Sequence, residues 1–409
     1  MSKILGITNC RSCESSNLKK IISLGSLYLS EFTTDNKKPP LYPLSLVLCN
    51  NCLLLQLEHT TPPSLLYTDN YGYRSGINST MRNELKEIVE KSLKKIPAKK
   101  RKYIICVDIG ANDGTLLENY GKEVKKVGIE PIKKLAKECK DHADVVINDF
   151  FNFNSYKKVL GNKKATIITA ISCFYDIGEP NKFLEDTVKI LASDGIFVVQ
   201  QNYLKSMLEL GAFDNVCHEH VAYYSLHSLI NLLNKHNLEV FDVELSPING
   251  GSFRTYVAFK NSRRVSPQVE KLLNLEKKLG LDKKKIYLEF AKKIKKNKKL
   301  LKNFVLEKVK KRQKIYLYGA STRGNTLIQY FELNNKLIPF AVERNTEKWG
   351  KKIASLGIPI ISEEQARKDK PDYMLVLPWF FRLEFEKREE KYLKSGGHFL
   401  FPLPKFEVV

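Results

Sequence analysis

The chain has 409 residues, 43% of them hydrophobic, and this length predicts two or three domains with apolar cores of their own. No apolar run reaches the length of a membrane-spanning helix and Met1-Ser2-Lys3 does not begin a signal peptide, so we expect a cytoplasmic protein without a membrane partner. Much of the formal net charge of +23 comes from lysines between Lys271 and Lys314 without interleaved aromatic residues, which favours a solvated helical face over a nucleic-acid-binding surface.

Four of the eight cysteines form C-x-x-C pairs in the N-terminal part of the chain. Two such pairs in a reducing compartment are typical of one tetrahedral zinc site, and four thiolates leave no open position for catalysis. A redox function fits less well, because neither pair opens a helix after a buried strand. The sequence therefore predicts a zinc-binding domain over residues 1–66, with strands from the segment 21–48 and a structural Zn²⁺ ion bound by Cys10, Cys13, Cys49 and Cys52.

A tyrosine-rich loop follows from Tyr67 to Gly76 and leads into a helix predicted over Thr80–Leu93. A tyrosine offers an apolar ring face together with a hydroxyl group, so Tyr71 and Tyr73 are candidates for contact with a ligand. Packing of the same tyrosines against the zinc-binding domain is an equal alternative.

The central stretch YIICVDIGANDGTL, residues 103–116, predicts a buried strand, a glycine turn and a helix, which together form the first half of a nucleotide-binding βα unit. Gly110-Ala111-Asn112 lacks the second glycine of the dinucleotide fingerprint, which argues against close approach of a pyrophosphate. No Lys-Ser or Lys-Thr pair follows Gly114, which argues against a P-loop. A glycine turn without any ligand is the alternative.

Acidic and amide side chains around this turn favour a particular ligand. Asp108 ends the predicted strand, and Asn112 and Asp113 lie in the turn. Glu130 ends the next apolar run, where a ribose-binding carboxylate usually lies. Because such groups suit a cationic nucleoside without phosphates, we predict that this site binds S-adenosylmethionine.

Strands predicted between residues 145 and 200 alternate with helices and continue a doubly wound sheet. Asp149 and Phe150 follow one strand and are candidates for contact with adenine. Ser172 and Asp176 follow another, at the carboxyl edge where open α/β sheets bind their ligands. The predicted cofactor-binding residues are Asp108, Gly110, Asn112, Asp113, Gly114, Glu130, Asp149, Phe150 and Ser172.

The segment from Asp214 to Ser225 carries a second motif whose side chains could take part in catalysis, C-H-E-H. His218 and His220 are two residues apart and so do not form the helical pair of a zinc protease. A carboxylate beside an imidazole can orient it and raise its basicity, which makes Glu219 and His220 candidates for proton transfer. The alternative is a polar loop before a helix that Ser225 caps.

After a glycine turn at residues 249–251, Arg254 lies on a predicted strand where it can meet an anion. The next segment, residues 263–313, has apolar residues at i+4 spacing, such as Phe290 and Ile294, with lysines filling the other face. We predict long amphipathic helices that connect two domains and offer a subunit contact. The protein is therefore expected to be a monomer or a homodimer.

The last segment, residues 314–409, has a strand, a glycine turn and a helix of its own, which predicts a second, smaller Rossmann-like domain. Gly319, Ser321 and Gly324 are candidates for binding a substrate diphosphate at the N-terminus of this helix. A scaffold domain whose glycine turn binds nothing is an equal alternative.

In this order, the motifs resemble those of the sugar C-methyltransferase family. The resemblance covers essentially the whole chain and is carried by the C-x-x-C pairs, Y-G-Y-R-S, D-I-G-A-N-D-G-T, C-H-E-H-V-A-Y-Y-S, N-G-G-S-F-R and Y-G-A-S-T-R-G-N-T. It implies an α/β protein with an N-terminal zinc-binding domain, a central Rossmann-like class I methyltransferase domain over residues 67–262 and a smaller C-terminal Rossmann-like domain. It also implies S-adenosylmethionine-dependent methylation of carbon atoms in nucleotide-linked keto-deoxysugars.

The resemblance implies a mechanism as well. A base removes the acidified proton from the carbon next to the keto group, and the resulting enolate attacks the methyl group of the cofactor. By similarity, His220 is the base and Glu219 its neighbour in the site. Tyr73 or Tyr71 is a ligand-facing hydroxyl, and Tyr224 belongs with the substrate-binding residues.

Two positions depart from the family pattern. Asp176 lies where several members carry a histidine, and an aspartate can hydrogen-bond a sugar hydroxyl but would not donate like a neutral imidazole. Cys217 lies where some members carry a tyrosine. These differences leave the sugar and the methylated carbon open. Alternatives from other classes are a nucleic-acid or other small-molecule methyltransferase, for which no N/D-P-P-Y/F motif is present, and a non-catalytic scaffold of the same fold.

Overall fold

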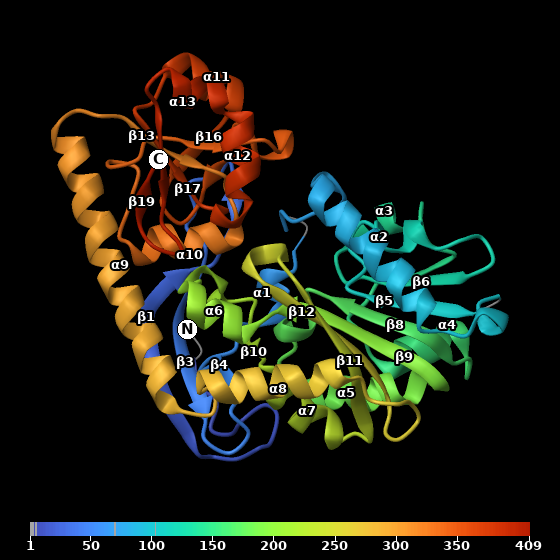
Figure 1. Cartoon of the computed structure of the whole chain (residues 1–409). Helices are drawn as coiled ribbons and strands as arrows, with labels where there is room; N and C mark the ends of the chain where they lie inside the picture. Colours follow the sequence, from blue (N-terminus) through green and yellow to red (C-terminus); the bar gives the residue numbers. More distant parts are fainter. Residues whose placement is uncertain (1–3, 5, 69–70, 103) are drawn as a thin grey trace.

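The computed structural model describes residue 4 and residues 6–68, 71–102 and 104–409 (Figure 1). Residues 1–3, Asp69 and Asn70 of the tyrosine-rich loop, and Tyr103 at the start of the predicted central strand lie outside the described residues. In Figure 1 the N-terminal strands (blue) lie between the long helix α9 (Lys284–Lys310) and the central sheet (green and cyan), with the C-terminal domain (red) above them.

The N-terminal sheet is antiparallel and has the order β1-β3-β4-β10 among the described residues. β1 (Leu18–Tyr28), β3 (Leu41–Cys49) and β4 (Leu55–Leu57) come from the predicted zinc-binding domain, whereas β10 (Ala222–Tyr223) comes from the segment after C-H-E-H. The short β2 (Phe32–Thr33) pairs instead with a strand of the C-terminal domain. The N-terminal residues therefore connect the other two domains.

Within the described residues, seven strands form the central sheet in the order β11-β12-β9-β8-β5-β6-β7. The run from β9 to β7 is parallel, and β12 and β11 return antiparallel at one edge. The strands are β5 (Ile105–Ile109), β6 (Lys125–Ile129), β7 (Val145–Ile147), β8 (Ala165–Ile171), β9 (Leu191–Asn202), β11 (Leu238–Ser246) and β12 (Ser252–Phe259). The α-helices of this region are α1 (Pro63–Leu66), α2 (Ser79–Lys94), α3 (Lys133–Cys139), α4 (Phe153–Leu160), α5 (Pro180–Ile190), α6 (Leu204–Leu210) and α7 (Leu226–Asn234).

The structure differs from the sequence prediction directly after the central glycine turn. In place of the predicted helix, Leu117–Asn119 forms one short turn of 3₁₀-helix. Few residues separate Gly114 from Gly121, and a segment of that length cannot complete the several turns that make an α-helix stable. The strand and the turn nevertheless agree with the prediction.

The helices α8 (Pro267–Leu279) and α9 connect the central sheet to the C-terminal domain. Ser266 caps α8 by accepting a hydrogen bond from the Gln268 amide, and Gly280, with φ of +75°, ends it in the left-handed conformation. As predicted, α9 is amphipathic: its apolar face packs into the cluster that also contains β1 and the C-terminal sheet, and its lysines face outward.

The C-terminal domain is a Rossmann-like α/β unit, which confirms the predicted fold class. Over the described residues its sheet has the order β19-β18-β17-β13-β14-β16-β15-β2, with a parallel centre. None of the helices in the described part of the chain combines the length and apolar character of a membrane span. The elements of this domain are β13 (Ile315–Tyr318), α10 (Thr322–Tyr330), β14 (Ala341–Glu343), β15 (Lys352–Ile353), β16 (Ile358–Ser362), α11 (Glu363–Asp369), β17 (Tyr373–Val376), α12 (Arg382–Arg388), α13 (Glu390–Lys394), β18 (His398–Phe401) and β19 (Glu407–Val408).

Candidate active site and zinc site

The four N-terminal cysteines come together in one cluster, with their sulfur atoms within 4.8 Å of one another. The Sγ atoms of Cys10 and Cys52 lie 3.5 Å apart, as do those of Cys13 and Cys49. Gln56 Nε2 donates to Cys10 Sγ at 3.2 Å, a contact that helps to stabilise a thiolate. Four converging thiolates fit a tetrahedral Zn²⁺ ion and leave no coordination position open, so the predicted structural zinc site is confirmed.

A cavity of about 740 Å³ opens at the carboxyl edge of the central sheet, where β5, β6 and β8 end. Gly110 follows β5 with φ of +73°, and a Cβ atom at this position would lie 3.2 Å from the Cys173 side chain, so glycine is needed for this turn. Of the predicted cofactor residues, those that line this cavity are Asp108, Gly110, Asn112, Glu130, Phe150 and Ser172.

Buried carboxyl groups form the polar wall of this cavity. Asp108 accepts a hydrogen bond from Thr169 Oγ1 at 2.5 Å, and burial raises its pKa to about 7. Glu130 accepts from the Asn112 amide at 2.9 Å and the Ile132 amide at 2.8 Å, and burial raises its pKa as well. Acidic groups around a glycine turn, with an apolar remainder, fit a cationic nucleoside such as S-adenosylmethionine.

The other predicted cofactor residues have local structural contacts. Asp113 accepts from the Gly76 amide at 2.8 Å and so attaches the tyrosine-rich loop to the turn. Gly114, with φ of +84°, lets the turn approach α3, because a Cβ atom there would lie 3.1 Å from Cys139 Cα. Asp149 accepts from the Phe150 amide and from Ser155 Oγ and does not line the cavity. These positions differ from the direct cofactor contacts that we predicted.

A second cavity, of about 410 Å³, lies between the central sheet and the C-terminal domain. Its walls include Glu219 and His220 on one side and Gly319 and Ser321 on the other. We call it the substrate cavity and the larger one the cofactor cavity, after the roles that the sequence predicts for residues in their walls. The residues that line both are Tyr71, Tyr73, Met81, Ser172 and Asp176.

His220 is held in one tautomer. Its Nδ1 atom lies 2.9 Å from the main-chain oxygen of Asn215, so Nδ1 carries the proton and donates it. Its ring packs edge-on against Tyr175, with centroids 4.3 Å apart. Burial, followed by the positive charge of Arg323, lowers the pKa of His220 to about 3. The imidazole is therefore neutral near pH 7, with its Nε2 lone pair available to a proton.

The carboxyl groups of Asp176 and Glu219, near His220, have raised pKa values, whereas the pKa of His220 is lowered. Burial raises the pKa of Asp176 well above its ordinary range, and the charge of Glu219 adds to the effect. Burial also raises the pKa of Glu219. Asp176 Oδ1 has no hydrogen-bond partner in the described part of the chain, although it is shielded from solvent. A protonated aspartate can donate a hydrogen bond as well as accept one, so the raised pKa adds a donor to the acceptor that we expected at Asp176.

Among the predicted substrate-binding residues, some do not reach the substrate cavity. Tyr224 is fully buried beside Phe174, with ring centroids 5.4 Å apart. Arg254 is 1% exposed and donates to Gln200 at 2.7 Å and Glu84 at 2.9 Å, so it joins α2 to the sheet and does not line the substrate cavity. Gly324 lies in the first turn of α10, where its amide donates to Ser321 Oγ.

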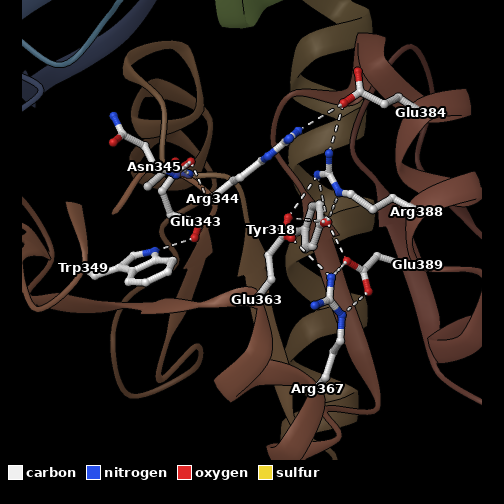
Figure 2. Close-up of polar contacts among 11 residues, drawn as sticks. Tyr318, Glu343, Arg344, Asn345, Trp349, Glu363, Arg367, Glu384, Arg388 and Glu389 are labelled. Atoms are coloured by element: carbon white, nitrogen blue, oxygen red, sulfur yellow. Dashed lines mark hydrogen bonds and ion pairs between the residues drawn. The ribbon is translucent and has the colours of Figure 1, made fainter. Parts of the chain in front are cut away.

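The C-terminal wall of the substrate cavity contains charged residues that the sequence analysis did not select (Figure 2). Glu343 ends β14 and accepts from the Ala320 amide at 3.0 Å. The strand–glycine turn–helix–strand order that places an acidic residue here could have identified it. Arg344 and Arg388 both point toward Glu384, at 4.0 and 3.0 Å (Figure 2).

Three family models match successive parts of the chain. A zinc binding domain matches residues 10–67, a "Methyltransferase domain" matches residues 77–243, and a "C-methyltransferase C-terminal domain" matches residues 247–404. A curated relative, the C-methyltransferase NovU of Streptomyces niveus, is 28% identical over 410 residues, which covers 98% of this chain and 97% of NovU.

Solved structures resemble only part of the chain. The N-methyltransferase NodS from Bradyrhizobium japonicum WM9 has a TM-score of 0.34 at 13% identity and covers 45% of this chain and 99% of its own. An S-adenosylmethionine-dependent methyltransferase from Clostridium acetobutylicum ATCC 824 has a TM-score of 0.33 at 10% identity and covers 46% of this chain and 94% of its own. With the three family models in sequence and a relative of matching length, the chain belongs to the S-adenosylmethionine-dependent C-methyltransferases that its motifs predict.

Proposed function

We propose that the chain transfers a methyl group to the carbon next to the keto group of a nucleotide-linked deoxysugar, by way of an enolate. The position of His220 carries this proposal. His220 lines the substrate cavity, which shares Tyr71, Ser172 and Asp176 with the cofactor cavity, and its Nε2 atom is free to accept a proton. The relative NovU is named as a C-methyltransferase, and the motif resemblance implies the sugar substrate.

In this proposal, His220 Nε2 takes the proton from the carbon next to the keto group, and the electrons of that bond pass toward the keto oxygen. S-adenosylmethionine, when bound, supplies an electrophilic methyl group. Tyr73 and Asp176 donate hydrogen bonds to the keto oxygen or a neighbouring hydroxyl. Tyr73 is 45% exposed, and desolvation of its hydroxyl in the cavity wall raises its pKa to about 12, so the hydroxyl is protonated near pH 7. Glu219 lies beside the base as a further polar contact for the sugar.

We assign the cofactor to the larger cavity by the chemistry of its walls. Glu130, at the end of β6, is the acceptor for the ribose hydroxyls, and Phe150 is a surface for adenine. Asp108 and the turn at Gly110 lie where β5 ends and suit the charged amino-acid part of the cofactor.

The nucleotide part of the substrate fits the C-terminal side. Gly319 and Ser321 precede α10, whose N-terminus suits a diphosphate. Lys348 and Arg344 add positive charge to this wall. The substrate thus spans two domains, and we propose the domain limits 1–66, 67–262, 263–313 and 314–409. A reducing, cytoplasmic location suits a cluster of cysteines that form no disulfide bonds.

The test is incubation of the protein with S-adenosylmethionine and a panel of nucleotide-linked 4-keto sugars, followed by mass spectrometry and NMR. We expect a gain of one methylene in the sugar, located by NMR on a carbon beside the keto group. Methylation of oxygen or nitrogen in place of carbon would contradict the proposed reaction, and turnover of a keto compound without a nucleotide at equal kcat/KM would contradict the proposed substrate class.

A further inference from the structure

Arg323 lies where the C-terminal domain meets the catalytic domain. It is in the first turn of α10, directly after the glycine turn, and it lines the substrate cavity together with His220. Its Nε and Nη2 atoms donate to Asp214 Oδ2 at 2.9 and 2.5 Å, and its Nη1 atom donates to the Asn249 oxygen at 3.1 Å. The C-terminal domain thus places a cation at the wall of the cavity that holds the base.

The guanidinium is held in place before any ligand binds. Asp214 is fully buried and also accepts a hydrogen bond from Trp379 Nε1 at 3.2 Å. The Phe380 ring lies 4.7 Å from the guanidinium carbon of Arg323. A guanidinium has more N–H donors than these contacts use, so donors remain for a ligand in the cavity.

The groups that face His220 give Arg323 a particular electrostatic position. Asp176 and Glu219 have raised pKa values and are protonated over a wider range than usual. Burial also raises the pKa values of Tyr175 and Cys217, while the charge of Arg323 acts in the opposite direction on both. Arg323 is thus the positive charge that acts on the imidazole, on the Tyr175 ring and on the Cys217 thiol, whereas the carboxylate of Asp176 acts on Tyr175 and Cys217 in the opposite direction.

We propose that Arg323 stabilises the oxyanion that forms when His220 takes the proton from the substrate, an inference that rests on the proposed function. In this step a C–H bond breaks and its proton goes to Nε2. The electron pair of that bond forms a carbon–carbon double bond, and the π pair of the carbonyl moves onto the keto oxygen. Negative charge develops in a cavity that has a fixed guanidinium in its wall, which is the arrangement that lowers the barrier to such a step.

A purely structural role is the competing explanation, because the Arg323–Asp214 pair also joins two domains. The neutral Trp379 also donates a hydrogen bond to Asp214 across the same two domains, so Trp379→Phe removes an interdomain contact without removing a positive charge and is a matched control. Removal of Arg323 alone leaves a buried unpaired carboxylate, which destabilises proteins strongly. The double variant Arg323→Met with Asp214→Asn removes the carboxylate charge as well, so a loss of activity in this variant cannot be attributed to an unpaired buried charge.

The experiment measures deuterium incorporation beside the keto group by NMR, in D₂O and without S-adenosylmethionine, as a function of pH. The probe is a nucleotide-linked 4-keto sugar that the wild-type enzyme methylates. We expect Arg323→Met, alone and with Asp214→Asn, to lower the exchange rate by about 100-fold or more. We also expect the acidic limb of the exchange profile to move to higher pH, because His220 no longer feels the positive charge. Arg323→Lys should lie between these variants and wild type, and Trp379→Phe should keep the wild-type pH profile.

Exchange by the folded double variant at the wild-type rate and pH midpoint would overturn the inference. An increase in KM at unchanged exchange would do the same and would make Arg323 a phosphate contact. These results leave the proposed function intact, since wild-type exchange and methylation persist. If the wild-type enzyme neither exchanges nor methylates any member of the panel, the proposed function fails, and this inference fails with it. Circular dichroism and calorimetry of S-adenosylmethionine binding report whether each variant is folded.

Discussion

The Nδ1 atom of His220 donates a hydrogen bond to the main-chain oxygen of Asn215, over 2.9 Å. A main-chain oxygen can only accept, so this contact assigns the ring proton to Nδ1 and the lone pair to Nε2. Asn215 is itself fixed, because its Nδ2 atom donates to the Ala212 oxygen at 3.1 Å. The orientation of the base is therefore determined by the fold before a substrate enters.

Replacement of His220 by asparagine removes this base while keeping a polar side chain. We expect kcat for carbon methylation to fall by about 100- to 10,000-fold, the usual contribution of general base catalysis. Binding of S-adenosylmethionine, measured by calorimetry, should remain, because His220 does not line the cofactor cavity. The neighbouring His218 forms a hydrogen bond with the main-chain oxygen of Tyr42 and lines neither cavity, so His218→Asn is the matched control. Wild-type turnover by His220→Asn would show that another group removes the proton.

The lowered pKa of His220 predicts an unusual pH dependence. Burial and the charge of Arg323 oppose protonation, so the neutral, basic form persists as the pH falls through the ordinary histidine range. We expect kcat/KM at about pH 5.5 to stay near its plateau, whereas a histidine with a pKa near 6.5 would reduce it about tenfold. Initial rates from about pH 5 to 9 provide the measurement. A tenfold loss by pH 5.5 in the folded enzyme would contradict the shift.

Asp176 is predicted to act as a protonated donor. Burial raises its pKa, so its carboxyl group stays neutral to higher pH than an ordinary aspartate and can donate where family members carry a histidine. We expect Asp176→Asn, which keeps a donor, to retain kcat within about tenfold, and Asp176→Leu to lose about 100-fold. The asparagine variant should also lose any alkaline limb that Asp176 causes. Equal losses of kcat in both variants would show that Asp176 acts as an ionised carboxylate and not as a hydrogen-bond donor.

The periodic parts of the chain could be predicted from the sequence, because strands and turns leave local patterns. The apolar run before Gly110 and the next run before Glu130 are strands as predicted, and a cavity lies at the sheet edge where they end. The strand ends and turns depend on residues close together in the sequence. Each C-x-x-C pair is local too, whereas the contacts between the pairs, Cys10–Cys52 and Cys13–Cys49, span 42 and 36 residues and were inferred from the four ligands that zinc requires.

Contacts between distant segments could not be predicted in this way. Arg323 and Asp214 are 109 residues apart, and no periodicity indicates that they meet. The predicted strand at Arg254 is correct, but its alternation did not indicate that the arginine side chain faces Glu84 on α2. Asp149 follows a strand as predicted. Its carboxylate nevertheless accepts hydrogen bonds from the Phe150 amide and the Ser155 hydroxyl, since a short acidic side chain readily accepts from nearby groups.

Removal of the Glu130 carboxylate tests the cofactor assignment. Glu130→Ala removes the acceptor at the end of β6, and we expect the Kd for S-adenosylmethionine to rise about tenfold or more, as lost hydrogen bonds to a charged group cost about 1.5–3 kcal/mol. Titration calorimetry measures the change. Asp141 is exposed and lies outside the cavity, so Asp141→Asn should bind the cofactor like wild type. A wild-type Kd for Glu130→Ala would place the ribose elsewhere.

Loss of the metal should destabilise more than the N-terminal segment, because β2 pairs with the C-terminal sheet and β10 pairs with β4. We expect about one Zn²⁺ per chain by metal analysis, and a lower Tm after treatment with a strong chelator, since a structural zinc site contributes directly to folding. Cys13→Ser should lose zinc and lower Tm in the same way, with methylation falling as the domains separate. Cys106 is buried in the central sheet and does not belong to the cysteine cluster, so the Cys106→Ala variant should keep the zinc ion in that cluster. Full zinc content in Cys13→Ser, or an unchanged Tm after the metal is removed, would contradict a structural tetrathiolate site.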